Sequence, residues 1–259
     1  MNKAPMSLDK EKIAGCFRQA LATYDCQATV QRELGIRLLS LAGKFPAISY
    51  ERVLEIGCCT GLLTQMLCEQ QRVNTLFLND LVPDFALSVM ARIPEDRLPA
   101  IQPLFGDIES LQLPSRLSLV ISGATFQWLA DLPRCLHLLS QSLREHGFLV
   151  FSVFGPGTLY EFTELTGMGL DYRTPEQIGD LLAADFIIEE RVNDQAQLIL
   201  PTPRDVLHHL RATGVSGLRA YRWTSTLLHH FEDEYRARFG TPEGVPVTYA
   251  SSCFIARKK

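Results

Sequence analysis

The sequence lacks the features that would place the protein in a membrane or on nucleic acid. Its longest uninterrupted apolar runs fall far short of the roughly 18 residues that a membrane-spanning helix needs. Lys and Arg number 25 against 29 Asp and Glu, a net charge of −4 at pH 7, so there is no overall basic field for nucleic acid. We therefore expect neither a membrane protein nor a nucleic-acid-binding protein.

Cysteine pairs of the kind that bind zinc are also absent. The seven cysteines include no C-x-x-C pair, and Cys58 and Cys59 are adjacent in the chain, so we expect no structural metal site. The stretch MNKAPMSLDKEK is polar and has no apolar core of a secretory signal. A reducing cytoplasm is therefore the expected compartment.

Glycine and proline are too scarce for a disordered or collagen-like chain, since the 259 residues contain only 17 and 14 of them. A chain of this length allows one large domain or one and a half, and it can bury roughly 70–75% of its unfolded surface. The composition predicts an ordinary globular protein, and we expect a single domain over residues 1–259.

Short apolar strands alternate with helical patterns along most of the chain. This alternation predicts crossover units and a parallel sheet, and right-handed crossovers make the sheet doubly wound. We therefore expect an α/β fold with a doubly wound, mostly parallel, seven-stranded sheet. The helix expected over residues 133–144 has its stop signal at Gly147. The expected strands are residues 51–56, 73–79, 100–105, 116–122, 148–154, 186–200 and 247–256.

Small or acidic residues follow three consecutive strands of the predicted sheet. In an open parallel sheet, ligands bind at the carboxyl ends of the strands. The first strand meets the turn Gly57-Cys-Cys-Thr-Gly61, the second ends at Asp80, and the third ends at Gly106-Asp107. The turn is not G-x-G-x-x-G, so a dinucleotide is poorly supported. Taken singly, the turn could hold no ligand and an acid could cap a helix, but the three together are specific.

Each of these strand ends suits one part of a nucleoside. An acid roughly 20 residues after a glycine turn can accept hydrogen bonds from both hydroxyls of a ribose, which is the role expected of Asp80. At the third strand end, Asp107 can accept a hydrogen bond from an exocyclic amino group, while Ile108 can pack on a purine face.

The three strand ends together resemble the class I S-adenosylmethionine-dependent methyltransferases. Val53-Leu-Glu-Ile-Gly-Cys-Cys-Thr-Gly61 resembles the first motif of that family, a strand followed by E/D-x-G-x-G-x-G, and the likeness covers about residues 50–155. Cys59 stands where the family usually has its middle glycine, and if that position needs a positive φ, a cysteine costs on the order of 1 kcal/mol. The resemblance implies S-adenosyl-L-methionine as cofactor, held by Tyr24, Glu55, Gly57, Cys58, Cys59, Gly61, Asp80, Leu81, Asp107, Ile108 and Ser122.

Further motifs, inside and outside that region, resemble a narrower family, the malonyl-acyl-carrier-protein O-methyltransferases of biotin synthesis. They include Phe126-Gln-Trp128, Leu210-Arg-Ala-Thr-Gly214 and Pro246-Val-Thr-Tyr249, and the likeness runs nearly end to end. It implies methyl ester formation on the free carboxylate of malonyl-acyl carrier protein. Because a carboxylate is already ionised near pH 7, we expect alignment and exclusion of water to drive the transfer, with no catalytic acid or base.

A composition break at Pro-Thr-Pro, residues 201–203, marks the start of a helical lid and divides the chain into a core and a lid. The cofactor-binding core is expected over residues 46–200 and 241–259, while helices in residues 1–45 contribute to a lid formed by residues 201–240. We expect a monomer on which the acidic carrier protein docks transiently at this lid. An arginine with its planar fork suits the substrate carboxylate. The expected substrate-binding residues are Gln127, Trp128, Arg173, Arg211 and Arg219.

Two other functions stay open from the sequence. The same fold could methylate a small free carboxylic acid or another small molecule, which would need no basic docking face on the lid. Alternatively, if Cys59 disrupts the glycine turn, the protein could bind the cofactor without catalysing methyl transfer. The adjacent histidines at 208–209 and 229–230 are expected to pack in the lid or lie on its surface, because neighbours on a helix point in different directions.

Overall fold

The computed structural model describes residues 8–215 and 223–259. The chain divides into two compact units, each built from several stretches of sequence. The sheet unit comprises Gln31–Val153, Arg173–Asn193 and Ser252–Lys259. The helical unit comprises Met1–Val30, Phe154–Tyr172 and Asp194–Ser251.

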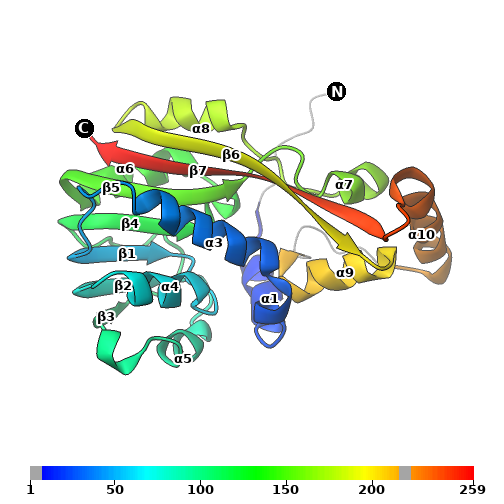
Figure 1. The fold of residues 1–259 in the computed structure, drawn as a ribbon, viewed down its shortest axis with the longest axis horizontal. Helices are drawn as coiled ribbons and strands as arrows, with labels where there is room; N and C mark the ends of the chain where they lie inside the picture. The colour runs from blue at the N-terminus through cyan, green and yellow to red at the C-terminus, as the bar shows by residue number, and fades with distance from the viewer. Residues whose placement is uncertain (1–7, 216–222) are drawn as a thin grey trace. The chain divides into compact units, whose positions relative to one another are not determined.

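A seven-stranded sheet has the strand order β3-β2-β1-β4-β5-β7-β6 (Figure 1). The neighbouring pairs β2–β1, β3–β2, β1–β4 and β4–β5 are all parallel, and the predicted α/β fold is confirmed. The strand order reverses between β1 and β4, and such a switch point is where open sheets bind ligands. The strands are β1 (Arg52–Ile56), β2 (Thr75–Asn79), β3 (Ala100–Pro103), β4 (Leu117–Gly123), β5 (Leu143–Phe154), β6 (Phe186–Leu200) and β7 (Val245–Lys258).

The helices of the sheet unit begin at the capping signals that their sequences contain. Asp131 caps α6 by accepting a hydrogen bond from the backbone N–H of Arg134. Thr174 and Gln177 form a complete capping box at the start of α8. The helices and 3-10 turns, with most of α3 in this unit, are α3 (Thr29–Ala42), α4 (Leu62–Gln70), α5 (Phe85–Met90), η1 (Glu95–Arg97), η2 (Phe126–Trp128), α6 (Leu132–Ser142) and α8 (Pro175–Leu182).

The hydrophobic core of the sheet unit lies along its central strands. All of β4 except its last residue, Gly123, is buried, as expected for a strand covered on both faces. The ring of Phe151 stacks on Phe126 and on Phe254, with ring centroids 4.7 and 5.0 Å apart. Leu139 of α6 joins the same buried cluster. The loops at the carboxyl ends of the strands therefore extend from a closely packed core.

Gly147 lies inside β5, so the helix stop expected there is wrong. The strand β5 follows α6 directly. A Cβ at Gly147 would lie 3.1 Å from the carbonyl oxygen of Leu117, and the preceding His146 has a φ of 60°. The register of β5 against β4 shifts between Leu117 and Leu119. The glycine thus serves a close approach of two strands at an irregularity in the sheet.

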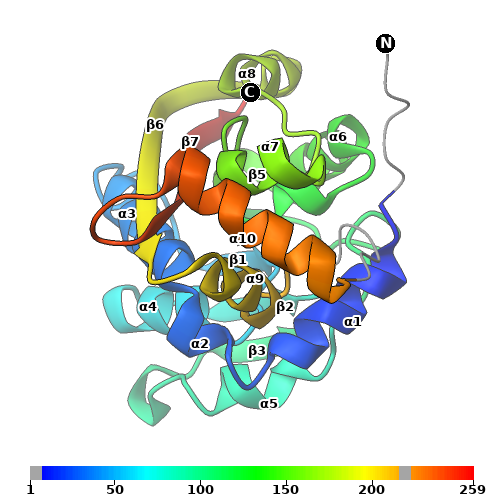
Figure 2. The same ribbon diagram turned by 90° about the vertical axis from the view of Figure 1, so that its right-hand side faces the viewer.

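The helical unit contains two helices of the predicted lid, α9 and α10. They contact each other, and α10 also contacts α7 (Figure 2). A Cβ at Gly214, which follows α9 with a φ of 75°, would lie 2.6 Å from the ring of Phe17, so only glycine allows this approach. None of the described helices is both long and apolar enough to cross a membrane. The helices of this unit are α1 (Lys10–Ala20), α2 (Tyr24–Gln27), α7 (Tyr160–Thr166), α9 (Pro203–Ala212) and α10 (Ser225–Phe239).

Candidate functional site

The turn between β1 and α4 has three residues in the left-handed backbone region. Gly57, Cys59 and Gly61 have φ values of 73°, 48° and 90°. A Cβ at Gly57 would lie 2.0 Å from Thr125 Oγ1, and a Cβ at Gly61 would lie 2.9 Å from the Cα of Val89. Both glycines are therefore required by close neighbours as well as by the backbone conformation.

Cys59 adopts the positive φ that the motif reserves for glycine. A side chain in this left-handed conformation costs on the order of 1 kcal/mol. Its backbone N–H still donates to Asp80 Oδ2 at 2.8 Å, so the turn keeps a hydrogen bond at the strained residue. The neighbouring Cys58 is buried, and burial raises the pKa of its thiol well above the ordinary value. The turn is therefore strained at Cys59 but keeps its hydrogen bond to Asp80.

Asp80 stands at the end of β2 and joins the glycine turn to the following loop. Its Oδ2 accepts from the N–H of Cys59 and its Oδ1 accepts from the N–H of Val82, both at 2.8 Å. Burial raises the pKa of this carboxyl to about 6, and the backbone N–H groups of Val82, Cys59 and Leu81 oppose that increase. Asp80 is therefore mostly ionised at neutral pH, with acceptor capacity left for the hydroxyls of a ligand.

Glu55, the acid of the glycine motif, is fully buried at the end of β1. Burial raises its pKa to about 8, the hydroxyl of Thr64 opposes this shift, and the charge of Asp80 adds to it. Neither carboxyl oxygen has a hydrogen bond of good geometry within the described residues. The carboxyl is therefore protonated at neutral pH, and leaving it unpaired is costly.

Asn79 holds the three strand ends together, and the sequence reasoning missed it. Its side-chain Nδ2 donates to the carbonyl oxygens of Leu104 at 2.7 Å and Gly106 at 3.0 Å. The backbone carbonyl oxygen of Asn79 accepts hydrogen bonds from the backbone N–H groups of Gly57 and Cys58. The signal that could have found it is an amide side chain at the buried end of a strand, directly before the predicted ribose acid.

The third strand end presents Asp107 after a left-handed glycine, Gly106, with a φ of 129°. Asp107 is half-buried, and its Oδ1 accepts from the N–H of Glu109 at 3.1 Å. Ile108 is only 4% exposed and packs in the core, so little of its side chain is left for a purine to cover. The contact with a purine stays a prediction.

The segment after β4 carries Gln127 and Trp128 on the turn η2. The Nε2 of Gln127 donates to the carbonyl oxygen of Ala124, which fixes the orientation of the amide. Its buried Oε1 has no hydrogen-bond partner among the described residues, so it is an acceptor available to a donor. Trp128 beside it is half-buried. Ser122 is fully buried and donates its hydroxyl to the carbonyl oxygen of Ile56 at 2.9 Å, which ties β4 to β1.

The remaining predicted site residues are divided between the two units. Arg173 belongs to the sheet unit and is half-buried just before α8. Tyr24 and Arg211 belong to the helical unit. The ring of Tyr24 lies 6.5 Å from that of Phe17, while Arg211 is exposed in the last turn of α9. Arg219 lies outside the residues that the structure describes.

A buried histidine–tyrosine pair lies in the helical unit, and no local sequence pattern indicates this pairing. His209 Nε2 lies 2.7 Å from the hydroxyl of Tyr249, and His209 is 1% exposed. Burial lowers the pKa of His209 to about 4, with a smaller effect from the adjacent His208, so the ring is neutral at neutral pH. By contrast, His208, His229 and His230 are exposed.

The strand ends of the sheet unit offer acidic acceptors to a ligand, while the N–H groups of the glycine turn at residues 57, 58, 59 and 61 bond within the protein. Over residues 8–215 and 223–259, no group of three or more His, Cys, Asp or Glu side chains is arranged to hold a metal ion. None of the seven cysteines, all of them in these ranges, is in a disulfide. The arrangement suits an organic ligand that brings hydroxyls, an amino group and positive charge to the switch point of the sheet.

The fold is that of the class I methyltransferases. A family model described as a methyltransferase domain matches residues 54–151. A putative methyltransferase from Bacillus halodurans has the same fold, with a TM-score of 0.62 and 16% identity over 86% of this chain and 97% of that one. The N-methyltransferase NodS from Bradyrhizobium japonicum, solved with S-adenosyl-l-homocysteine, gives a TM-score of 0.55 and 17% identity over 88% and 86%.

The relatives in sequence are more specific. A protein of Chlorobium luteolum named malonyl-[acyl-carrier protein] O-methyltransferase is 34% identical over 256 residues, which cover 97% of this chain and 96% of that protein. The chain belongs to the malonyl-[acyl-carrier protein] O-methyltransferase family. The match includes the helical unit as well as the strand ends, and the family predicted from the sequence is confirmed.

Proposed function

We propose that the protein transfers a methyl group from S-adenosyl-L-methionine to the free carboxylate of malonyl-acyl carrier protein, an early step of biotin synthesis. The observation that carries this proposal is the nearly full-length likeness to a protein of that name. The product is a methyl ester, and masking the charge of the malonyl carboxylate allows fatty-acid synthesis to extend it. The protein acts as a monomer in the cytoplasm.

The strand ends fit this cofactor. S-adenosyl-L-methionine supplies a methyl group on a positively charged sulfonium. Glu55 places a buried carboxyl at the glycine turn that has no hydrogen-bond partner among the described residues, and the positive charge of the bound cofactor would favour its ionised, hydrogen-bond-accepting form. Asp80 accepts from the ribose hydroxyls, and Asp107 accepts from the adenine amino group. The left-handed glycines at 57 and 61 let the backbone approach the ligand.

The remaining cofactor contacts follow the family pattern. The proposed set also includes Cys58, Cys59, Leu81, Ile108 and Ser122 at the strand ends, of which Cys58, Ile108 and Ser122 are at most 4% exposed. Tyr24 is the last residue of the proposed cofactor-binding set.

The methyl transfer needs positioning more than proton transfer. The substrate carboxylate is ionised near pH 7, so no general base is required. Its oxygen would bond to the methyl carbon as the carbon–sulfur bond breaks, and S-adenosyl-L-homocysteine would leave as a neutral thioether. Residues 1–45 and 201–240 form a lid that excludes water. Gln127 and Trp128 position the malonyl group, and a guanidinium from Arg173, Arg211 or Arg219 pairs with its carboxylate. The lid also docks the acidic carrier protein transiently.

Transfer of labelled methyl from S-adenosyl-L-methionine to malonyl-acyl carrier protein tests the proposal, with malonyl-coenzyme A, free malonate and trans-aconitate run in parallel. We expect label on the carrier-protein thioester at a rate well above that on free malonate. Label on the free acids alone would overturn the carrier-protein substrate in favour of a small carboxylic acid. Cofactor binding without label on any acceptor would contradict the proposed reaction while leaving the cofactor site intact.

Arginine variants then identify the partner of the substrate carboxylate. Arg173→Gln, Arg211→Gln and Arg219→Gln each remove one guanidinium, and Arg97→Gln removes an exposed one as the control. Loss of a charge-assisted pair costs about 2 kcal/mol, which is roughly a thirtyfold rise in KM for the malonyl thioester. We expect this rise in one of the three variants and none in the control. Unchanged KM in all three would contradict the assignment.

A further inference from the structure

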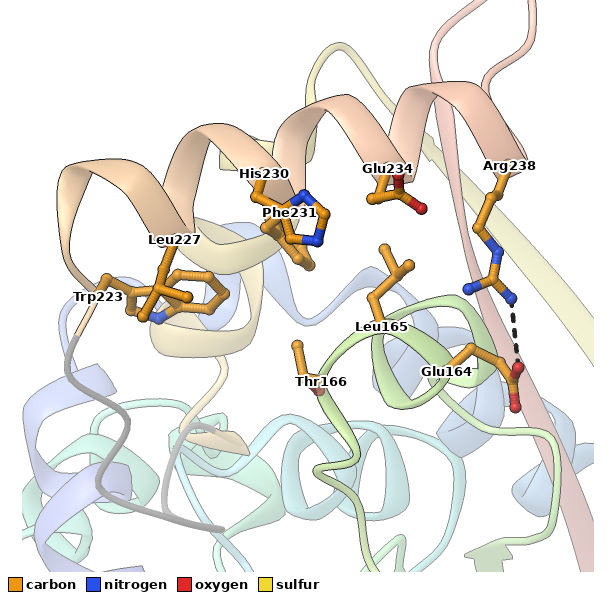
Figure 3. A pocket seen from close by; sticks show the side chains of 9 residues that line it. All are labelled: Glu164, Leu165, Thr166, Trp223, Leu227, His230, Phe231, Glu234 and Arg238. Atoms are coloured by element: carbon orange, nitrogen blue, oxygen red, sulfur yellow. Dashed lines mark hydrogen bonds and ion pairs between the residues drawn. The ribbon is translucent and has the colours of Figure 1, made fainter.

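A cavity of about 200 Å³ lies between α7 and α10 in the helical unit (Figure 3). It shares none of the residues named for cofactor or substrate binding, and its lining residues from 223 to 238 belong to the proposed lid. Its volume equals that of about seven molecules of liquid water, which suits a small ligand and is below the range for coenzymes. The lining residues are Glu164, Leu165, Thr166, Trp223, Leu227, His230, Phe231, Glu234 and Arg238.

The apolar part of the cavity is built from two aromatic rings and two leucines. The rings of Trp223 and Phe231 meet edge to face, with centroids 5.1 Å apart. Leu165 comes from α7, and Leu227, which is 41% exposed, lies at the solvent side of α10. Faces of Trp and Phe rings attract cations because of their quadrupoles. The cavity therefore offers an apolar ligand body a wall that also favours a nearby positive charge.

The polar part of the cavity carries an excess of negative charge. Arg238 Nη2 pairs with Glu164 Oε2 at 3.3 Å, the contact drawn as a dashed line in Figure 3. Glu234 is half-buried and has no hydrogen bond or ion pair with any described residue. Two acids against one arginine leave a charge of 1 − 2 = −1 on the lining, with histidine counted as neutral.

The spacing of residues along α10 places three polar side chains of the cavity on one face of the helix. His230, Glu234 and Arg238 follow one another at intervals of four residues, so they lie on one face of the helix. Phe231, one residue from His230, is buried on the cavity side. Figure 3 shows Glu234 between the aromatic end of the cavity and the ion pair of Arg238 with Glu164. A cation resting on the rings therefore meets an uncompensated carboxylate.

We infer that this cavity binds a small organic amine. The ammonium group donates to the carboxylate of Glu234, and an aromatic or branched apolar body packs against Trp223, Phe231 and Leu165. A carboxylate ligand is disfavoured because it would meet Glu234 and Glu164, whereas the one arginine is already paired. This site goes beyond the proposed methyl transfer, since it depends on no residue of the strand ends.

Isothermal titration calorimetry on the full chain tests the site with three probes of the same shape. Phenethylammonium carries the charge, phenethyl alcohol replaces it with a hydroxyl, and phenylacetate reverses it. We expect saturable binding of one phenethylammonium per chain, with an affinity about tenfold above that of the alcohol. No measurable binding of phenylacetate is expected.

Three variants assign the charge preference to particular residues. Glu234→Gln should lower the affinity for phenethylammonium about tenfold, to that of the alcohol, and leave alcohol binding unchanged. Asp233→Asn removes the same charge from an exposed neighbour outside the cavity and should have little effect. Arg238→Gln should raise the affinity for the amine severalfold, because it leaves the charge of Glu164 uncompensated.

Each of several results would overturn the inference. They are equal binding of amine and alcohol to the unaltered chain, preferential binding of phenylacetate, absence of saturable binding, and equal losses in Glu234→Gln and Asp233→Asn. Circular dichroism spectra of the variants check that α10 is retained. Methyl transfer activity does not enter the test, so failure here leaves the proposed function standing and failure of the proposed function leaves this result standing.

Discussion

The strand ends of the sheet unit and the buried polar contacts of the helical unit are held together in different ways. At the strand ends, backbone groups dominate: Asp80 and Asn79 bond to N–H and C=O groups of the neighbouring loops. In the helical unit, side chains from distant parts of the chain pair with each other, as His209 does with Tyr249. Backbone geometry needs particular residue types at particular positions, whereas side-chain pairs depend on packing that local sequence does not specify.

The two regions also respond to pH in opposite directions. Burial raises the pKa of Glu55 in the sheet unit to about 8, and it lowers the pKa of His209 in the helical unit to about 4. Both groups are neutral at pH 7 for the same physical reason, because burial disfavours the charged form. The comparison predicts that Glu55 lowers the free energy of unfolding as pH rises, and that His209 lowers it as pH falls.

The largest effect is expected from Gly57→Ala at the strand ends. The new Cβ would lie 2.0 Å from Thr125 Oγ1 at a φ of 73°, so both a clash and backbone strain arise, and we expect a loss of about 4 kcal/mol in the free energy of unfolding. Gly167→Ala in the helical unit is the matched control, since its φ is 65° and no atom lies within 4 Å. Its expected loss is about 1 kcal/mol. Urea unfolding gives both values, and equal losses would contradict the close packing of the turn.

The pH dependence of Glu55 should be the next largest effect. Its folded pKa of about 8 is above the ordinary 4.5, so its contribution to stability is complete below pH 4.5 and is lost as pH rises through 8. Glu55→Gln removes this titration. From pH 5 to 8, we expect the stability of the unaltered protein relative to the variant to fall by about 3 kcal/mol. The exposed Glu69→Gln should show no such trend, and a flat difference for Glu55→Gln would refute the assignment.

His209 should give a smaller effect of opposite sign. Its folded pKa of about 4 is below the ordinary 6.5, so its contribution is complete above pH 6.5 and is lost as pH falls through 4. Relative to His209→Gln, the unaltered protein should lose about 2 kcal/mol in urea unfolding between pH 7 and pH 4.5. His208→Gln, at the exposed neighbour, is the control. If both variants showed the same trend, burial of His209 would not be its cause.

Cys59→Gly should produce the smallest change, and in the stabilising direction. The left-handed φ of 48° strains a residue with a Cβ, and its relief should add about 1 kcal/mol to the free energy of unfolding. Cys59→Ala keeps the Cβ and should bring no gain. Thermal unfolding of the two variants distinguishes strain from loss of the thiol, and an equal gain in both would point to the thiol.

The sequence was informative where the backbone requires a residue type. Gly57, Gly61 and Asp80 mark the strand ends because a left-handed turn needs glycine and the proposed ribose contact needs an acid, and the structure places the turn and the acid together. Gly147 carried the same kind of signal but was misread, because a glycine ends helices and also lets strands approach closely. Local pattern alone does not separate the two uses.

Contacts between residues far apart in the chain were not predictable. His209 and Tyr249 lie 40 residues apart, and nothing in either local segment indicates the partner. Likewise, Glu161 accepts hydrogen bonds from both the N–H and the hydroxyl of Thr248, 87 residues away. Only a family resemblance suggested that the Tyr249 segment matters. Helices α1, α9 and α10 of the helical unit were thus predicted and α7 was not, while the buried polar pairs of this unit were found only in the folded chain.

Calorimetric titration of S-adenosyl-L-methionine into the unaltered protein, Asp80→Asn and the exposed Asp96→Asn most directly tests the central claim that the strand ends bind the cofactor. Asp80→Asn keeps an oxygen for a backbone N–H and loses the charged acceptor for the ribose hydroxyls. We expect one cofactor per chain, an affinity at least tenfold lower in Asp80→Asn, and no change in Asp96→Asn. Unaltered affinity in Asp80→Asn, or no binding to the unaltered protein, would contradict the assignment of the site.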